Sequence, residues 1–159
     1  MLLLVFLFVI RSASSQLLNK DDCGKTKSCF SEPPSCTSSL DCKYILKYSV
    51  ASNQQDVEIE LSSKEYQWIA VGFNPKTKSM AGGEALACET HGNKVDLQHY
   101  NMPERSQPYP SEDTNATLMS SNISANILSC KIKRKLDLGV MKRTNLSNRV
   151  YFLYAAGNM

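Results

Sequence analysis

The sequence predicts an all-β protein built as an antiparallel β-sandwich, and three observations lead to that prediction. Apolar residues recur at every second position in several short runs, and turn-forming residues separate those runs. No long stretch carries the 3.6-residue period of an amphipathic helix. About seven short strands without intervening helices exclude a βαβ architecture. The 159 residues suit a single domain behind a short leader.

The N-terminus has the pattern of a secretory signal peptide covering residues 1–15. Its first ten residues are almost wholly apolar, and small residues follow Arg11. The apolar run is shorter than the roughly 20 residues that a transmembrane helix needs. Removing the signal lowers the formal charge from +3 to +2, which gives no reason to expect a nucleic-acid partner. We therefore expect a secreted, extracellular or luminal protein, attached to a membrane only if the chain continues beyond Met159.

Glycosylation sequons and cysteines fit that compartment. The sequons lie at Asn115, Asn122 and Asn145, between or beside strand-like runs. All six cysteines lie beyond the signal, and an even count in an oxidising compartment predicts disulfides. Cys88 and Cys130 each fall inside a strand-like run far from the others, so we expect them to pair. The pairing among the remaining four stays open, and their spacing does not suit a zinc site: Cys23, Cys29, Cys36 and Cys42.

The leader, residues 16–42, is polar and rich in turn residues, and it shows neither a strand nor a helix period. We expect it to form a short cysteine-rich cap stapled by disulfides. From residue 43 onward the period becomes two. Tyr44–Val50 and Val57–Leu61 each alternate apolar and polar side chains, which predicts two half-buried strands.

The middle of the chain predicts a central strand followed by a hairpin. Trp68–Phe73 is continuously apolar apart from a glycine, as in a strand covered on both faces, and the segment after it breaks the strand. Glu84–Cys88 and Val95–Tyr100 then form a pair around a turn at Gly92-Asn93.

The last third of the chain is less regular. Residues 101–121 contain three prolines and many hydroxyl groups, which predicts a long surface loop. The alternation changes phase between Ile123 and Ile132, which indicates one strand with a β-bulge. Residues 136–143 have room for at most a helical turn or two. Val150–Ala156 predicts a buried last strand that ends within a few residues of Met159, and we expect the domain, residues 43–159, to be incomplete there.

Several of these motifs together resemble a known family. In chain order, Cys23-Gly-Lys-Thr-Lys-Ser-Cys29, Trp68-Ile-Ala-Val-Gly-Phe73, Met80-Ala-Gly-Gly83 and Ala87-Cys88 resemble the DOMON domain of ferric-chelate-reductase-like proteins. The resemblance implies an immunoglobulin-like sandwich of about ten strands. It also implies, from several relatives, a b-type haem held between a methionine and a histidine.

Met80 matches the methionine ligand of that family, and a thioether is a suitable axial ligand because it favours reduced iron. The family's histidine follows the strand that Tyr151–Gly157 resembles, where this sequence stops. The chain itself contains only His91 and His99. His91 lies in the hairpin turn, where a solvated imidazole is common, whereas His99 alternates with Val95 and reaches toward the interior, either as a structural histidine or as a ligand.

The other site candidates each have two interpretations. Trp68 and Phe73 line either the core or a cofactor pocket, and Met80 is either a ligand or a packing residue that fills irregular space. Gly82 and Gly83 allow a flat ligand to approach the backbone, or they simply make a tight turn.

The sequence contains no catalytic motif of a hydrolase, a dinucleotide-binding fold or a phosphate loop. Two hypotheses follow from the resemblance. The first is an extracellular haem b electron-transfer module, related to ferric-chelate reductases and serving a membrane cytochrome b module or another redox partner, with no self-contained catalytic site. The second is a non-enzymatic extracellular module without haem, which binds another protein through its loops.

Overall fold

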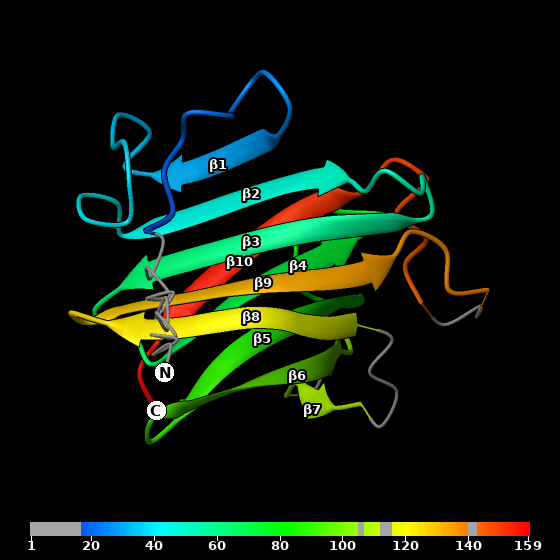
Figure 1. Ribbon diagram of the computed structural model, residues 1–159. Coiled ribbons are helices and arrows are strands. Elements are labelled where there is room, and N and C mark those ends of the chain that lie inside the picture. The colour runs from blue at the N-terminus through cyan, green and yellow to red at the C-terminus, as the bar shows by residue number, and fades with distance from the viewer. Residues whose placement is uncertain (1–16, 105–106, 112–115, 140–142) are drawn as a thin grey trace, which may run out of the picture.

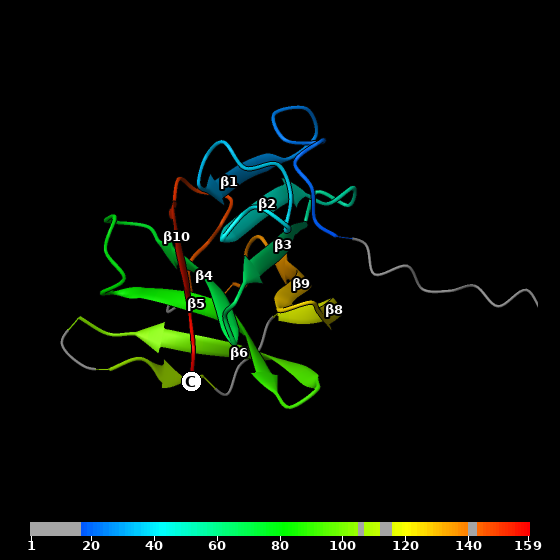
Figure 2. The same cartoon turned by 90° about the vertical axis from the view of Figure 1, so that its left-hand side faces the viewer.

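The computed structural model describes residues 17–104, 107–111, 116–139 and 143–159, which form two five-stranded antiparallel sheets (Figure 1). The two sheets pack as layers, which the view turned by 90° separates (Figure 2). No described residue is helical, and none of the described segments has the helical length and hydropathy needed to cross a bilayer. The predicted all-β antiparallel sandwich is therefore confirmed.

The first sheet has the strand order β1-β2-β3-β9-β8, and the second has the order β10-β4-β5-β6-β7. The strands of the first sheet are β1 (Ser28–Glu32), β2 (Tyr44–Val50), β3 (Asp56–Lys64), β9 (Ile127–Lys135) and β8 (Ala116–Ser124). Those of the second are β10 (Tyr151–Gly157), β4 (Trp68–Asn74), β5 (Gly83–His91), β6 (Lys94–Met102) and β7 (Tyr109–Pro110).

The core lies between the sheets and consists of every second residue of the long strands. Because successive side chains of a strand point to opposite faces, each sheet contributes one apolar face to this core. The fully buried members are Tyr44, Leu46, Val57, Ile59, Leu61, Ile69, Val71, Phe73, Leu86, Cys88, Leu128, Cys130 and Ile132.

Three disulfides tie the chain together, and no described cysteine is free. Cys88 on β5 pairs with Cys130 on β9, so this bond joins the two sheets across the core. The four leader cysteines, whose pairing the sequence leaves open, form two small loops. The pairs are Cys23–Cys29 and Cys36–Cys42.

The leader is more than a cap, and the expectation that it contains no strand was wrong. β1 pairs with β2 along its whole length and extends the first sheet. Lys20 fixes the chain around this strand, because its Nζ donates to Ser31 Oγ at 2.8 Å and to the Cys36 carbonyl at 2.9 Å. The polar sequence of β1 hides the strand because β1 lies at the edge of the sheet.

Two expectations for the last third were also wrong. β8 begins at Ala116, inside the segment expected to be a loop, and the expected single bulged strand is a β8–β9 hairpin. Its turn residues, Ala125 and Asn126, have φ values of 50° and 61°. A two-residue turn with two positive φ values normally contains glycine, and its absence hid the turn. The one register shift in this hairpin lies between Leu118 and Ser120.

Candidate functional site

The segment between β4 and β5, residues 75–82, carries Met80, and we call it the Met80 loop. Asn74, the last residue of β4, organises this loop from a buried position. Its Nδ2 donates to the carbonyls of Ser79 at 2.7 Å and Ala81 at 2.9 Å, which flank Met80. Its Oδ1 accepts from the backbone N–H groups of residues 76 and 77 at 2.9 and 3.2 Å. One side-chain amide therefore satisfies four backbone groups of the loop.

The two glycines after Met80 close the loop. The Gly83 N–H donates to the Met80 carbonyl at 3.1 Å, and the Gly82 N–H donates to the Met102 carbonyl at 2.6 Å. A Cβ on Gly83 would lie 2.7 Å from the carbonyl oxygen of Phe73, and Gly82 has a φ of +80°. Glycine is therefore required at both positions, at one for space and at the other for backbone conformation.

The Met80 loop presents its thioether to the outside, since Met80 is 40% exposed. Asn74 shares the outward face of β4 with Ala70 and Gly72, because all three alternate with core residues. In register beside them on β5 lie Ala85, opposite Gly72, and Ala87, opposite Ala70. The loop therefore begins at one end of a sheet face whose central residues have almost no side chains.

The structure places Trp68 and Phe73 on opposite faces of β4. Trp68 points outward at the start of the strand, where a Cβ on Gly157 would lie 2.7 Å from its ring. It is six residues, or about 20 Å, from the end that carries the Met80 loop. Phe73 points into the core, packs edge-on against Phe152 at 5.3 Å, and lies under the guanidinium of Arg134. The two rings therefore cannot line one pocket together.

His99 also points into the core, as its alternation with Val95 predicts, and it is only 2% exposed. Its Nε2 lies 2.9 Å from Oε2 of Glu84, which is on the neighbouring strand β5. The other oxygen of Glu84 accepts from Arg134 Nη2 at 2.6 Å and from the Thr144 N–H at 3.0 Å. Because Arg134 comes from β9, this ion pair spans the sandwich from one sheet to the other.

Arg143 joins the same cluster, and we call Glu84, His99, Arg134 and Arg143 the core ion-pair network. Arg143 Nη1 lies 3.5 Å from Glu84 Oε2 and 3.3 Å from His99 Nε2, and it donates to Asn101 Oδ1 at 2.8 Å. Two guanidinium groups thus surround one carboxylate in a nearly dry environment.

The network shifts the pKa values of Glu84 and Arg134. Burial alone would raise the pKa of Glu84, but the hydrogen bond with His99 and the charge of Arg134 outweigh it and hold the pKa of this carboxyl below its ordinary value. Burial lowers the pKa of the Arg134 guanidinium, although its charge pairing with Glu84 opposes that shift. Glu84 is therefore an ionised, structurally engaged carboxylate.

His91 remains on the surface, as expected. It ends β5 at the hairpin turn, and its imidazole lies 3.9 Å from Glu89. That position is eight residues from Gly83, or roughly 26 Å along the strand from the Met80 loop. Among the described residues, no group of three or more His, Cys, Asp or Glu side chains is arranged to hold a metal ion.

These positions test how well the chain fits the haem that the family resemblance implies. The exposed thioether of Met80 and the glycine- and alanine-rich face suit one side of a flat ligand. His99 faces the opposite side of the sheet and contacts Glu84, and His91 lies at the far end of β5. Of the three candidate ligands Met80, His91 and His99, the structure therefore places only Met80 beside this face.

Sequence reasoning missed Asn74, Glu84, Arg134 and Arg143. Two of them did leave a signal in the pattern of alternation. Glu84 is in phase with the core residues Leu86 and Cys88, and Arg134 is in phase with Ile132. A charged residue in a core position predicts a partner of opposite charge.

Two of the three sequons are described. Asn122 lies on β8, and Asn145 lies in the segment between β9 and β10. Asn115 falls outside the described residues.

Comparison with known proteins gives one family. A model of the DOMON domain matches residues 40–157. The DOMON domain-containing protein FRRS1L of Homo sapiens is 33% identical over 144 residues, which cover 86% of this chain and 46% of that protein. The putative ferric-chelate reductase 1 of Danio rerio is 27% identical over 140 residues, which cover 86% of this chain and 24% of that protein. The chain thus spans less than half the length of these relatives.

A solved structure shares the fold. The cytochrome domain of Myriococcum thermophilum cellobiose dehydrogenase aligns with a TM-score of 0.51 and 15% sequence identity, covering 76% of this chain and 60% of that domain. At this identity the likeness concerns the arrangement of strands.

Proposed function

The chain belongs to the DOMON domain family, and on this premise we propose that it provides the methionine side of an extracellular haem-binding electron-transfer module. The observation that supports the proposal most directly is the Met80 loop. Asn74, Gly82 and Gly83 hold a partly exposed thioether at the end of a sheet face whose central residues are Ala70, Gly72 and Ala85, beside Leu153 and Met102.

In this proposal each residue has a defined task. Met80 ligates the iron and Asn74 fixes the loop that carries it. The macrocycle lies over the face of Ala70, Gly72 and Ala85 once the side chains of Leu153 and Met102, which contact Gly72, turn aside. A bound haem supplies one-electron redox chemistry. The second axial ligand comes from a residue outside positions 1–159, because His91 and His99 lie elsewhere in the sandwich.

The proposal includes location and partners. The apolar N-terminus acts as a secretory signal peptide ending near residue 15, and residues 16–42 and 43–159 reach the extracellular or luminal side together. There the module exchanges electrons with a membrane cytochrome b module or another redox partner. It has no catalytic site of its own.

A haem titration with added imidazole tests this function, because free imidazole replaces the missing histidine. We expect the purified chain to bind haem and show a Soret band whose position depends on Met80. Met80→Ala should lose that dependence, whereas Met119→Ala, which alters a similarly exposed methionine on the other sheet, should not. A chain that gives no Soret band with imidazole, or an unchanged spectrum in Met80→Ala, would contradict the proposal.

A second candidate is a non-enzymatic extracellular module without haem. The engagement of His99 in the core ion-pair network favours it, since neither histidine of the chain is positioned as a partner for Met80. Under this alternative, the segment between β6 and β8 provides the contact with a partner protein. This alternative predicts that the protein remains colourless after the titration. It also predicts that a partner found by pull-down is lost when Gln107–Ser111 is replaced by glycine and serine.

A further inference from the structure

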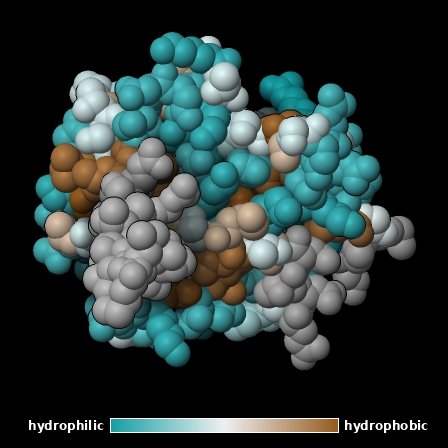
Figure 3. Space-filling model, viewed as in Figure 1, coloured by the Kyte–Doolittle hydropathy of each residue, from teal (hydrophilic) through white to brown (hydrophobic). Residues whose placement is uncertain are grey.

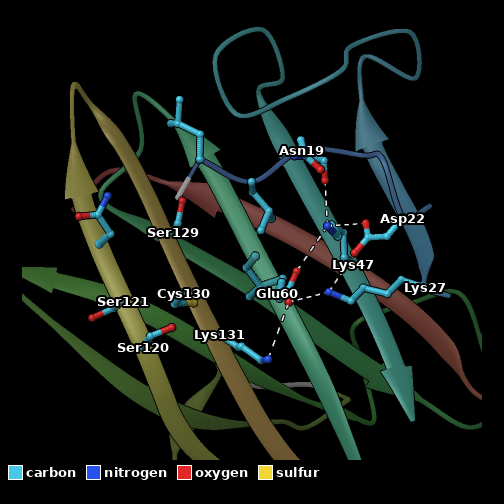
Figure 4. Close-up of a pocket in the computed structure, with 14 residues that line it drawn as sticks. Asn19, Asp22, Lys27, Lys47, Glu60, Ser120, Ser121, Ser129, Cys130 and Lys131 are labelled. Atoms are coloured by element: carbon cyan, nitrogen blue, oxygen red, sulfur yellow. Dashed lines mark hydrogen bonds and ion pairs between the residues drawn. The ribbon is translucent and has the colours of Figure 1, made fainter. Parts of the chain in front are cut away.

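A polar groove lies on the outer face of the first sheet, whereas the Met80 loop belongs to the second sheet (Figure 4). Its cavity volume of about 620 Å³ is in the range that holds a small organic ligand. The leader forms one wall, β3 and β9 form the floor, and β8 forms the other wall. The space-filling view of this side of the molecule shows mainly hydrophilic side chains with hydrophobic patches between them (Figure 3).

The charged side chains of the groove neutralise one another. Lys47 Nζ contacts Asp22 at 2.6 Å and donates to the Asn19 carbonyl at 2.9 Å, and Lys27 Nζ contacts Glu60 at 2.8 Å. Lys131 contacts Glu58 at 2.6 Å. A groove whose ammonium groups are already paired is poorly suited to an anion, so its ligand should be neutral and polar.

The opposite wall supplies neutral polar groups. Ser120, Ser121 and Asn122 of β8 line it, and Ser129 lies beside them on the β9 floor, where its hydroxyl donates to Ser62 Oγ at 3.0 Å. Leu17 and Leu18 add a small apolar surface from the leader. Hydroxyls, an amide and a short apolar contact match the hydroxyl and acetamide groups of N-acetylglucosamine.

Asn122 is also the acceptor of a sequon, since Ser124 stands two residues after it. Among the described residues, its side-chain amide has no hydrogen-bond partner, although the residue is half-buried. The amide of Asn145 differs, because its Nδ2 donates to Asp137 Oδ2 at 2.8 Å and its Oδ1 accepts from the Ser147 N–H at 2.8 Å. In the folded structure the side-chain amide of Asn145 is therefore hydrogen-bonded, whereas that of Asn122 faces the groove.

We propose that the polar groove is the seat of an N-linked glycan carried by Asn122, whose first two N-acetylglucosamine residues pack between the leader and β8. The glycan joins Asn122 through a bond from Nδ2 to C1 of the sugar. That C1 leaves a lipid-linked diphosphate donor, which departs with the electron pair of the C1–O bond, and Nδ2 gives up one proton. The inference rests on entry into the secretory pathway, as the proposed function does.

The docked sugars would act as a bridge between the leader and the edge strand. Asn19 and Asp22 of the leader already contact Lys47 on β2, and β8 reaches the same face only through β9. A glycan fixed at Asn122 therefore links two segments that form opposite walls of the groove.

Native deglycosylation tests the inference. The full chain is produced in a secretory mammalian host that makes high-mannose glycans, and release by an endoglycosidase is followed at each sequon by mass spectrometry. In the folded protein we expect the Asn122 glycan to be released about ten-fold more slowly than the Asn145 glycan, with equal rates after denaturation. Equal rates in the folded protein, or an occupied Asn145 beside an unoccupied Asn122, would overturn the inference.

Sequon variants provide the matched controls. Ser124→Ala removes the glycan without changing Asn122, whereas Ser124→Thr keeps the sequon. We expect amide hydrogen exchange in residues 17–22 to accelerate in Ser124→Ala and in Asn122→Gln, and to remain unchanged in Ser124→Thr and in Asn145→Gln. Unchanged exchange in both glycan-free variants would also overturn the inference. If neither described sequon carries a glycan, both this inference and the proposed extracellular location fail, whereas an empty Asn122 alone leaves the location standing.

Discussion

Gly83 and Glu84 are neighbours on β5, yet they belong to two regions with opposite properties. Gly83 faces outward and closes the Met80 loop, where a methionine is exposed. Glu84 faces inward and holds the core ion-pair network, where a histidine and two arginines are buried. The two residues face opposite sides of the sheet because successive side chains of a strand alternate between its two faces. The outward region therefore leaves a thioether accessible, whereas the inward region couples the two sheets.

The largest expected effect comes from breaking the inward region. In Arg134→Met the Glu84 carboxylate loses its partner from the other sheet, and we expect the free energy of unfolding to fall by about 3–5 kcal/mol. Urea denaturation followed by the fluorescence of Trp68, the single tryptophan, measures this loss.

The double variant Glu84→Leu/Arg134→Met is the matched control. It removes both charges, so it should recover a large part of the lost stability. If the double variant is as unstable as the sum of the two single changes, the two residues act independently and the ion pair does not join the sheets.

The next largest effect should come from the residue that supports the outward region. Asn74→Ala leaves four backbone groups of the Met80 loop without their side-chain partner, and we expect a loss of about 1–3 kcal/mol together with faster amide exchange in residues 76–83. Asn74→Asp keeps the acceptor and loses the donor, so it should be intermediate. Unchanged exchange in Asn74→Ala would mean that the loop keeps its shape without this amide.

A smaller effect is the pH dependence of the stability that Glu84 contributes to the inward region. The folded-state pKa of Glu84 is lower than the ordinary value of 4.5, so its ionised form contributes stability that is fully present above about pH 4.5. This contribution is lost as the pH falls through the folded-state pKa. The stability difference between the wild type and Glu84→Gln should therefore shrink on acidification, as urea midpoints measured from neutral to acidic pH would show. Parallel pH curves for the two proteins would contradict this assignment, because Asp22 and Asp41 titrate equally in both.

The same comparison explains what the sequence could predict. The alternation of apolar and polar residues was sufficient to predict the two packed sheets, the β5–β6 hairpin and the inward direction of His99. It failed at β1, where an edge strand needs no apolar pattern, and at Ala125, where an ordinary residue adopts a turn conformation. The partner of Glu84 is Arg134, 50 positions away on the other sheet. Alternation shows that each residue faces the core, but a single sequence does not show that the two form a pair.

The smallest expected effect decides what Met80 is for. Leucine has nearly the volume of methionine, and 40% of the Met80 residue is exposed, so Met80→Leu should change the free energy of unfolding by no more than about 0.5 kcal/mol. Met102→Leu, at a position only 5% exposed, gives the reference for a buried methionine and should cost more. If Met80→Leu instead costs as much as Met102→Leu, Met80 is a packing residue and the outward region loses its ligand. If stability is kept while the Met80-dependent Soret band disappears, the thioether serves binding rather than packing.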